Sequence, residues 1–310
     1  MEILIQIGLL IIGFVMLVKG ADYFVDGAAG VAGKFGIPQI VIGLTIVAFG
    51  TSAPEAAVSI TAAFKGNAEI TIGNVVGSNI LNILIILGLT AVIVPLHVKK
   101  TTVKYEMPYV IFISIALAVL GLTDGTVGFA DGIILWAGML LFLVYLLKLT
   151  MSGEAEEAES DIRESNLWKL LLMIAGGLVV VVFGSDITVD SAIRIAEIFG
   201  VDERIIGLTI VALGTSLPEL VTCVMAGLKG NADIAVGNIV GSNIFNILFV
   251  VGTTALITPV EYAASFLTDS IACIVSAVLL WILVVKTKVL GRIGGALMLV
   301  WYVGYLAYLL

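Results

Sequence analysis

The stretch GTSAPE at residues 50–55 interrupts an almost wholly apolar run, and the same pattern returns as GTSLPE at 214–219. Each copy places a glutamate directly after a proline and close to two hydroxyl side chains. The whole chain is 60% hydrophobic and only 12% charged, with a mean hydropathy of +1.19. A soluble domain is about 25% charged. The composition therefore predicts a protein of the lipid bilayer, and the net charge of −8 gives no reason to expect a nucleic-acid partner.

The apolar runs are long enough to cross a membrane several times, since a transmembrane helix needs about 20 apolar residues. Reading the chain for such runs predicts an all-α polytopic membrane protein with ten spans. They lie near 2–24, 39–63, 70–95, 106–122, 128–149, 167–189, 204–227, 234–259, 266–285 and 290–309.

The basic residues predict how these spans are oriented, because cytoplasmic loops carry an excess of Lys and Arg. Ten spans with both termini outside would leave three basic residues on the outer side, Lys65, Arg194 and Arg204. The remaining twelve would be cytoplasmic: Lys19, Lys34, Lys99, Lys100, Lys104, Lys148, Arg163, Lys169, Lys229, Lys286, Lys288 and Arg292. We therefore expect a multi-pass protein of the cell membrane with outside termini.

The chain contains an internal repeat at an offset of 164 residues. Residues 43–95 align with 207–259 without a gap, and 32 of the 53 positions are identical. The stretch GNVVGSNILNILIILG at 73–88 falls on GNIVGSNIFNILFVVG at 237–252. With five spans in each half, the second half enters the membrane from the opposite side, which is the inverted repeat found in secondary transporters.

This repeat predicts the domain organisation. The first five-helix repeat is expected over 1–149, with its most closely repeated part about 39–95, and the second over 167–310, with the corresponding part about 203–259. The acidic stretch 150–166 between them is interpreted as a solvated cytoplasmic linker.

Both glutamates lie where charge is costly, and ionisable residues at membrane depth mark ion or substrate pathways by default. Pro54 and Pro218 remove backbone donors, so a broken helix is expected at each motif. Backbone carbonyls near the two breaks would then become available as oxygen ligands. Such irregular backbone is tolerated only where it is buried in protein or lines a cavity.

Helical spacing gathers further oxygen atoms around each glutamate. Thr51 and Ser52 share a helix face with Glu55. The corresponding set is Thr215, Ser216 and Glu219, and the neighbouring segments add Ser78, Asn82, Ser242 and Asn246. Neither His nor Cys is among these residues, so zinc and copper are poor candidates. A flexible oxygen cage with two negative charges suits a hard cation such as Ca2+, and Na+ would also fit the hydroxyl positions.

Other polar residues have simpler interpretations. Asn79 and Asn243 either join the ion site or form hydrogen bonds between helices. Four aspartates also repeat at the same offset, and we expect them at helix ends, where they cap the helix or face water: Asp22, Asp26, Asp186 and Asp190. The two cysteines, Cys223 and Cys273, are expected to be packed thiols.

The paired GTSxPE motifs, each followed by GNxxGSNxxN in inverted halves, resemble the cation/calcium exchanger (CaCA) superfamily, and within it the prokaryotic sodium/calcium exchangers. The resemblance covers essentially the whole chain. It implies a ten-helix exchanger whose ion site is built by the two repeats, with no cofactor and no obligate protein partner. Many members carry an aspartate at one of the two positions occupied here by Asn82 and Asn246.

The resemblance also implies roles for individual residues. Glu55 and Glu219 match the central acidic ligands. The family's hydroxyl and carbonyl ligands fall on Thr51, Ser52, Thr215, Ser216, Ala48 and Ala212. Ser78 and Ser242 match serines that serve Na+, whereas Asn82 and Asn246 complete the central site.

The expected function is therefore secondary antiport of Ca2+ against Na+, with alternating access around a site near the bilayer midplane. Helices one and six are expected to shift across the fixed core. Protons could replace Na+ by protonating Glu55 or Glu219. An ion channel would share the broken helices, and an intramembrane enzyme would need a nucleophile–base pair that the polar cluster does not offer.

Overall fold

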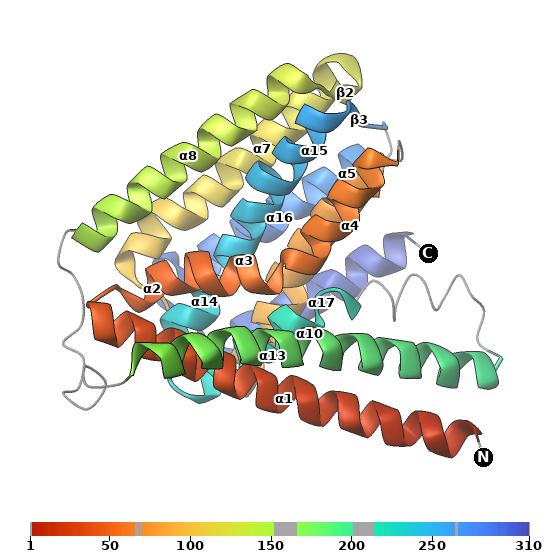
Figure 1. The fold of residues 1–310 in the computed structure, drawn as a ribbon. Coiled ribbons are helices and arrows are strands. Elements are labelled where there is room, and N and C mark those ends of the chain that lie inside the picture. The colour runs from red at the N-terminus through yellow and green to blue at the C-terminus, as the bar shows by residue number, and fades with distance from the viewer. Residues whose placement is uncertain are drawn as a thin grey trace.

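The computed structural model describes residues 2–65, 68, 70–151, 166–200, 214–263 and 266–309. The chain is mostly helical, with four strands of two residues each (Figure 1). The α-helices are α1 Glu2–Phe35, α2 Gln39–Ile42, α3 Ala48–Thr51, α4 Ala53–Phe64, α5 Ile70–Leu81, α6 Gly88–Ile93, α7 Met107–Asp124, α8 Phe129–Met151, α10 Leu167–Ile198, α13 Leu217–Leu228, α14 Ala232–Phe245, α15 Gly252–Ile257, α16 Phe266–Val285 and α17 Arg292–Leu309. Segments of π-helix join several of them: η1 Gly43–Val47, η2 Asn82–Leu87, η3 Thr102–Glu106 and η5 Asn246–Val251.

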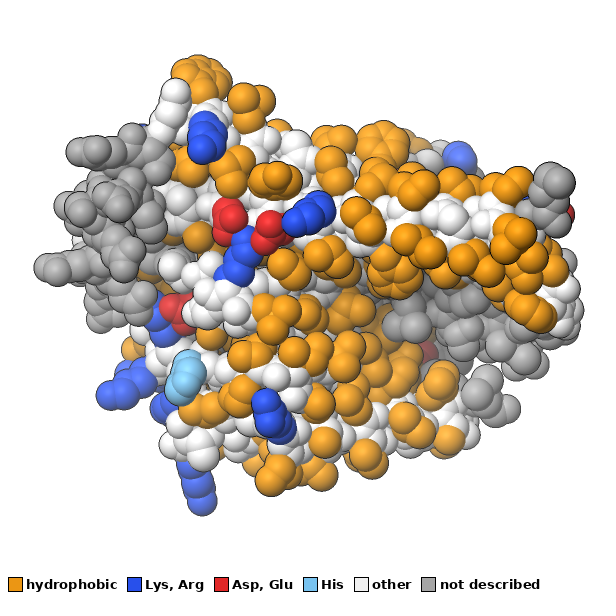
Figure 2. Space-filling model, turned by 90° about the horizontal axis from the view of Figure 1, so that it is seen from below, with side chains coloured by type: hydrophobic (Ala, Val, Ile, Leu, Met, Phe, Trp, Pro, Cys, Tyr) orange, Lys and Arg blue, Asp and Glu red, His pale blue; other side chains and the backbone are white. Residues whose placement is uncertain are grey.

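Seven helices of the described chain are long and apolar enough to cross a membrane, or eight if one bent pair counts as a span. The seven are Glu2–Phe35, Ile70–Ile93, Thr102–Asp124, Phe129–Met151, Leu167–Ile198, Ala232–Ile257 and Phe266–Val285. The bent pair is Gln39–Thr51 with Ala53–Phe64. Hydrophobic side chains cover most of the described face in Figure 2, and charged ones gather toward one end. The prediction of a helical, multi-pass membrane protein is confirmed.

The two longest helices, α1 and α10, lie antiparallel and side by side (Figure 1). Glycines bring their backbones into contact. A Cβ added at Gly20 would lie 2.9 Å from the carbonyl oxygen of Gly177, and one added at Gly184 would lie 3.0 Å from that of Gly13. Any side chain at these positions would therefore force the two helices apart.

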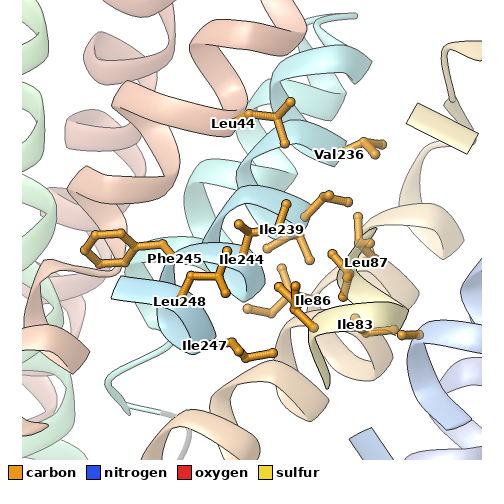
Figure 3. Close-up of a cluster of buried hydrophobic side chains, with 14 of the residues drawn as sticks. Leu44, Ile83, Ile86, Leu87, Val236, Ile239, Ile244, Phe245, Ile247 and Leu248 are labelled. Carbon is orange, nitrogen blue, oxygen red and sulfur yellow. The ribbon is translucent and has the colours of Figure 1, made fainter. Parts of the chain in front are cut away.

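The centre of the bundle is formed by α5–η2–α6 and α14–η5–α15. In the most apolar window of each segment, 72% of Ile70–Ile93 and 94% of Ala232–Ile257 is buried, against 17% for α1. Apolar side chains from η2 and from α14–η5 pack against one another in Figure 3, among them Ile83, Leu87, Ile239 and Leu248. These two segments correspond at the 164-residue offset, so the repeat forms the core.

The short strands also follow the repeat. Strand β1 (Leu96–His97) pairs antiparallel with β4 (Val289–Leu290), and β2 (Thr126–Val127) pairs antiparallel with β3 (Val260–Glu261). The 164-residue offset carries β1 onto β3 and overlaps β2 with β4. Each strand pair therefore joins one strand from each half of the sequence.

The four repeated aspartates do not lie at helix ends, and that part of the prediction was wrong, although Asp26, Asp186 and Asp190 are exposed. Asp22 and Asp26 lie inside α1, and Asp186 and Asp190 lie inside α10. The reason is length: α1 has 34 residues and α10 has 32, so both continue beyond the apolar runs expected at 2–24 and 167–189. Of the acidic linker expected at 150–166, residues 152–165 fall outside the described chain.

Candidate ion-binding site

The first GTSxPE motif breaks its helix as expected. Helix α3 ends at Thr51 and α4 begins at Ala53, and the axes on the two sides of Ser52 differ by 51°. Pro54 lies in the first turn of α4, where its missing N–H costs no helical hydrogen bond. Ser52 itself has φ −86° and ψ 7°, outside the helical range.

The second motif has the same local geometry. Ser216 has φ −93° and ψ 4°, and α13 begins at Leu217 with Pro218 in its first turn. The carbonyl of Gly214, which Pro218 cannot engage, accepts a hydrogen bond of 2.9 Å from Ser185 Oγ of α10. Residues 201–213, which include the expected ligand Ala212, fall outside the described chain.

The two glutamates lie in the first turns of α4 and α13, and the fold buries both. Glu55 is 1% exposed and Glu219 is 0% exposed. Ser52 Oγ donates a 2.8 Å hydrogen bond to Glu219 Oε1, so the first motif contacts the second directly. Glu219 is also an electrostatic neighbour of Glu55. The second oxygen of each carboxylate, Oε2, has no hydrogen-bond partner in the described structure.

Four asparagines join the two repeats in a reciprocal network. The amide nitrogen of Asn79 donates to the carbonyl of Asn243 at 3.3 Å, and that of Asn243 donates to the carbonyl of Asn79 at 3.2 Å. Asn82 Nδ2 donates to Asn243 Oδ1 at 3.0 Å, and Asn246 Nδ2 donates to Asn79 Oδ1 at 3.1 Å. All four are buried. The network fixes Asn82 and Asn246 by their nitrogens and leaves their Oδ1 atoms without partners.

Two further asparagines hold the broken helices. Thr51 Oγ1 contacts Asn238 Oδ1 at 3.0 Å, which ties α3 to α14. Asn74 Nδ2 donates to the backbone carbonyl of Glu55 at 3.2 Å and to Ser59 Oγ at 2.9 Å, which ties α5 to α4. The position of Glu55 is therefore fixed by α5, on which Ser78 also lies.

The remaining expected ligands are distributed as follows. Ser78, Ser216 and Ser242 are buried, and Ser216 Oγ and Ser242 Oγ have no hydrogen-bond partner within the described ranges. Thr215 is half-buried beside Ser216. The carbonyl of Ala48 accepts from the Ser52 backbone N–H at 3.0 Å and from Thr51 Oγ1 at 3.4 Å. Ala48 therefore already uses its carbonyl inside the helix.

The structure thus brings residues 164 positions apart into one polar cluster inside an apolar bundle. Six of its buried oxygens lack hydrogen-bond partners among the described residues: Glu55 Oε2, Glu219 Oε2, Asn82 Oδ1, Asn246 Oδ1, Ser216 Oγ and Ser242 Oγ. A buried polar group without a partner is costly, and a hard cation takes several oxygen ligands. Among the described residues no three His, Cys, Asp or Glu side chains lie together, so amides and hydroxyls contribute most of the oxygen atoms of this cluster.

The sequence left two roles open for Asn79 and Asn243, an ion ligand or a hydrogen bond between helices. Asn79 and Asn243 are hydrogen-bonded between helices, and each positions the last asparagine of the other repeat: Asn243 accepts from Asn82, and Asn79 accepts from Asn246. The spacing in GSNxxN places two asparagines on one helix face, but it does not indicate that their bonds run between the repeats. The spacing did place Asn238 one turn before Ser242 on the same helix face, but it did not predict its partner, because Thr51 lies in the other half of the chain.

The broken apolar helices and the buried oxygen cluster define a membrane protein with a polar, oxygen-rich cluster inside its bundle. The family model described as sodium/calcium exchanger protein matches residues 5–152 and 169–310. The chain therefore belongs to the sodium/calcium exchanger family, within the cation/calcium exchanger superfamily, and its proteins are membrane transporters.

Individual relatives agree with this assignment. The chain is 38% identical over 305 residues to the putative antiporter CaxA of Alkalimonas amylolytica, covering 95% of each protein. It is 31% identical to the sodium/calcium exchanger MaX1 of Methanosarcina acetivorans, covering 97% of each. A solved structure of the sodium-calcium exchanger NCX_Mj, soaked with 10 mM Na+ and zero Ca2+, matches with a TM-score of 0.84. That match has 32% identity and covers 98% of this chain and 99% of the other.

Proposed function

We propose that this protein exchanges Ca2+ for Na+ across the cell membrane by alternating access around the cluster of Glu55 and Glu219. The observation that carries the proposal is the pair of buried carboxylates from opposite halves, joined through Ser52, each with one oxygen unpartnered. Two carboxylates balance the charge of one Ca2+. The relatives named as sodium/calcium exchangers support Na+ as the counter-ion.

Competition for shared oxygens would couple the two ions. Ca2+ would take both carboxylates together with the free oxygens of Asn82 and Asn246. Na+ would take the same carboxylates and the hydroxyls of Thr51, Ser52, Ser78, Thr215, Ser216 and Ser242. The carbonyl of Ala212 would add to these, and that of Ala48 would do so in place of its 3.4 Å contact with Thr51 Oγ1. Because the two ions need the same carboxylates, the site would hold Ca2+ or Na+ in turn, and that exclusion would couple the two fluxes.

We further propose ten transmembrane helices arranged as two inverted five-helix repeats, residues 1–149 and 167–310. The reciprocal asparagine network and the exchanged strand pairs support this arrangement. Both termini would lie outside. In support, the β1–β4 pair and the bond from Val98 N–H to the Lys288 carbonyl place two of the predicted cytoplasmic basic clusters side by side.

The test is uptake of radioactive Ca2+ into Na+-loaded proteoliposomes. Wild type should take up Ca2+ only while an outward Na+ gradient exists, and Glu55→Gln and Glu219→Gln should each reduce uptake to background. Glu106→Gln is the matched control, since Glu106 is equally buried and accepts a hydrogen bond from Tyr145 outside this cluster. Full activity in either site variant would refute the assignment.

The same experiment decides between Na+ and H+ as the counter-ion. The unpartnered oxygen of each carboxylate is equally able to carry a proton. Ca2+ uptake driven by a pH step in the absence of Na+ would identify H+ as the counter-ion and would leave the assignment of the site unchanged. Flux that does not saturate and needs no counter-ion would instead indicate a channel.

A further inference from the structure

A lysine and two aspartates repeat on opposite sides of the molecule. At the 164-residue offset Lys65 corresponds to Lys229, Asp22 to Asp186, and Asp26 to Asp190. The lysines follow the ends of α4 and α13, and the aspartates lie inside α1 and α10. The sequence therefore provides two equivalent sets, each with one lysine on the core and two aspartates on a long helix.

One set is engaged. Lys229 Nζ lies 2.7 Å from Asp22 Oδ1 and 2.5 Å from Asp26 Oδ1, and it also donates to the Asp22 backbone carbonyl at 2.9 Å. The Lys229 side chain is only 22% exposed, so these contacts are partly shielded from water. Helix α1 packs along α13 over the same region. The ion pairs thus fasten the long helix to the core.

In the second set, Lys65 lies apart from the two aspartates. Lys65, Asp186 and Asp190 are all exposed, and in the described chain no ion pair joins Lys65 to either aspartate. Helix α10 makes almost no contact with α4, and the C-terminal end of α4 stands away from α10 in Figure 1. Two sets that are equivalent in sequence are therefore in opposite states.

We propose that the two lysines are alternating positioning residues: Lys229 holds α1 in the conformation seen here, and Lys65 holds α10 through Asp186 and Asp190 in the opposite one. The inference rests on the alternating access proposed above. Because the backbones of α1 and α10 touch through glycines, the two helices would move together. A movement that releases α1 from α13 would bring α10 against α4.

The spacing of the aspartates suits such a movement. Asp22 and Asp26 are one helical turn apart on the same face, as are Asp186 and Asp190. A shift by one turn, about 5 Å, would pass the lysine from one carboxylate to the next without leaving it unpaired. Each set would therefore act over a range of positions along the helix axis.

Spin-label distances on both sides provide the test. One label pair replaces Phe64 and Phe183, and the other replaces Tyr23 and Leu228; all four side chains are exposed beside the two sets. Measured in Na+, in Ca2+ and without either, the two distances should change in opposite directions. Loss of one partly exposed ion pair should shift the populations about two- to fivefold.

Variants that remove the lysine charges then distinguish a positioning role from a general structural role. Lys65→Gln should deplete the state with a short 64–183 distance, and Lys229→Gln should deplete the state with a short 23–228 distance. In vesicles, the half-saturating Ca2+ concentrations at the two membrane faces should move in opposite directions in these two variants. Lys65→Arg and Lys229→Arg should restore wild-type behaviour, and Lys100→Gln is the matched control.

The outcomes are distinct. A 64–183 distance that stays long under every ion condition would overturn the inference, as would equal shifts in Lys65→Gln and Lys100→Gln. The distance measurements test the positioning role of the two lysines independently of any measurement of ion flux. If wild type moves no Ca2+ against Na+, the proposed exchange fails, while the opposed distances would still support the paired lysines.

Discussion

The asparagine-linked core and the α1–α10 pair are held together by different means. In the core, four asparagines form directional hydrogen bonds and bulky apolar side chains interdigitate around them. Between α1 and α10 the contact passes through glycine backbones. Close backbone packing joins the two long helices to each other as one unit, and it does not interlock them with the core. The comparison distinguishes the core, which we propose to be fixed, from the helix pair, which we propose to move.

Gly177→Leu should have the largest effect, because it forces apart the two helices that we propose to move together. A Cβ at residue 177 would lie 2.6 Å from the Phe24 backbone nitrogen, so α1 itself would have to move. We expect transport in vesicles to fall about 100-fold while Ca2+ binding by purified protein is retained, a loss near 3 kcal/mol. Gly176→Leu is the matched control, since nothing lies within 4 Å of its Cβ. Equal loss in both variants would contradict this account of the contact.

Asn79→Ala tests the asparagine-linked core. It removes the acceptor for Asn246 Nδ2 and the donor to the Asn243 carbonyl, and leaves buried groups unpaired. We expect a loss of about 2 kcal/mol in the free energy of unfolding, measured in detergent with denaturant. Asn243→Ala should cost a similar amount. The double variant should cost clearly less than the sum, because the two residues share partners. Simple additivity would argue against a common network.

Ser52→Ala and Ser216→Ala compare the two motifs within the site. Both hydroxyls are proposed ligands, but only Ser52 has a hydrogen bond to a carboxylate here, whereas Ser216 Oγ has none. Ser52→Ala should therefore weaken Ca2+ binding about tenfold more than Ser216→Ala, near the low end for hydrogen bonds to charged groups. Calcium titration of the purified variants measures the difference. Equal losses would show that the bond to Glu219 adds nothing to binding.

Cys223→Ala should have the smallest effect. The thiol is buried in the core, where it contacts Thr90 Oγ1 and the Ala235 carbonyl, both weak sulfur interactions. We expect a change of about 1 kcal/mol or less in the free energy of unfolding and unchanged exchange. Thermal unfolding and vesicle uptake check both values. A loss comparable to that of Asn79→Ala would place Cys223 in the polar network.

The sequence predicted the parts of this molecule that depend on local pattern. The apolar runs predicted the helices, Pro54 and Pro218 predicted the breaks, and the repeat predicted that the two motifs meet. The lengths of the helices were harder to predict from the sequence, because Asp22 and Asp26 interrupt the apolar run of α1 without ending the helix. Their partner Lys229 lies more than 200 residues away, so nothing nearby in the chain indicates that the charges are compensated.

Distant pairing also limited the description of the site. Thr51 and Ser52 were identified from their spacing to Glu55, yet their side chains contact Asn238 and Glu219 of the other repeat. Spacing along a helix identifies which residues share a face, but not which of two equivalent partners each one takes. The difference between the two lysine sets is of the same kind, because a repeat predicts equal halves and a single conformation need not be symmetric.

The central claim is that Glu55 and Glu219 hold one cation between them. Equilibrium Ca2+ binding to the purified protein, followed by calorimetry with increasing Na+, tests this most directly. We predict that Na+ displaces the bound Ca2+ competitively, and that Glu55→Gln and Glu219→Gln each abolish the same binding event while Glu106→Gln leaves it intact. Retention of Na+-sensitive Ca2+ binding in either site variant would contradict the claim.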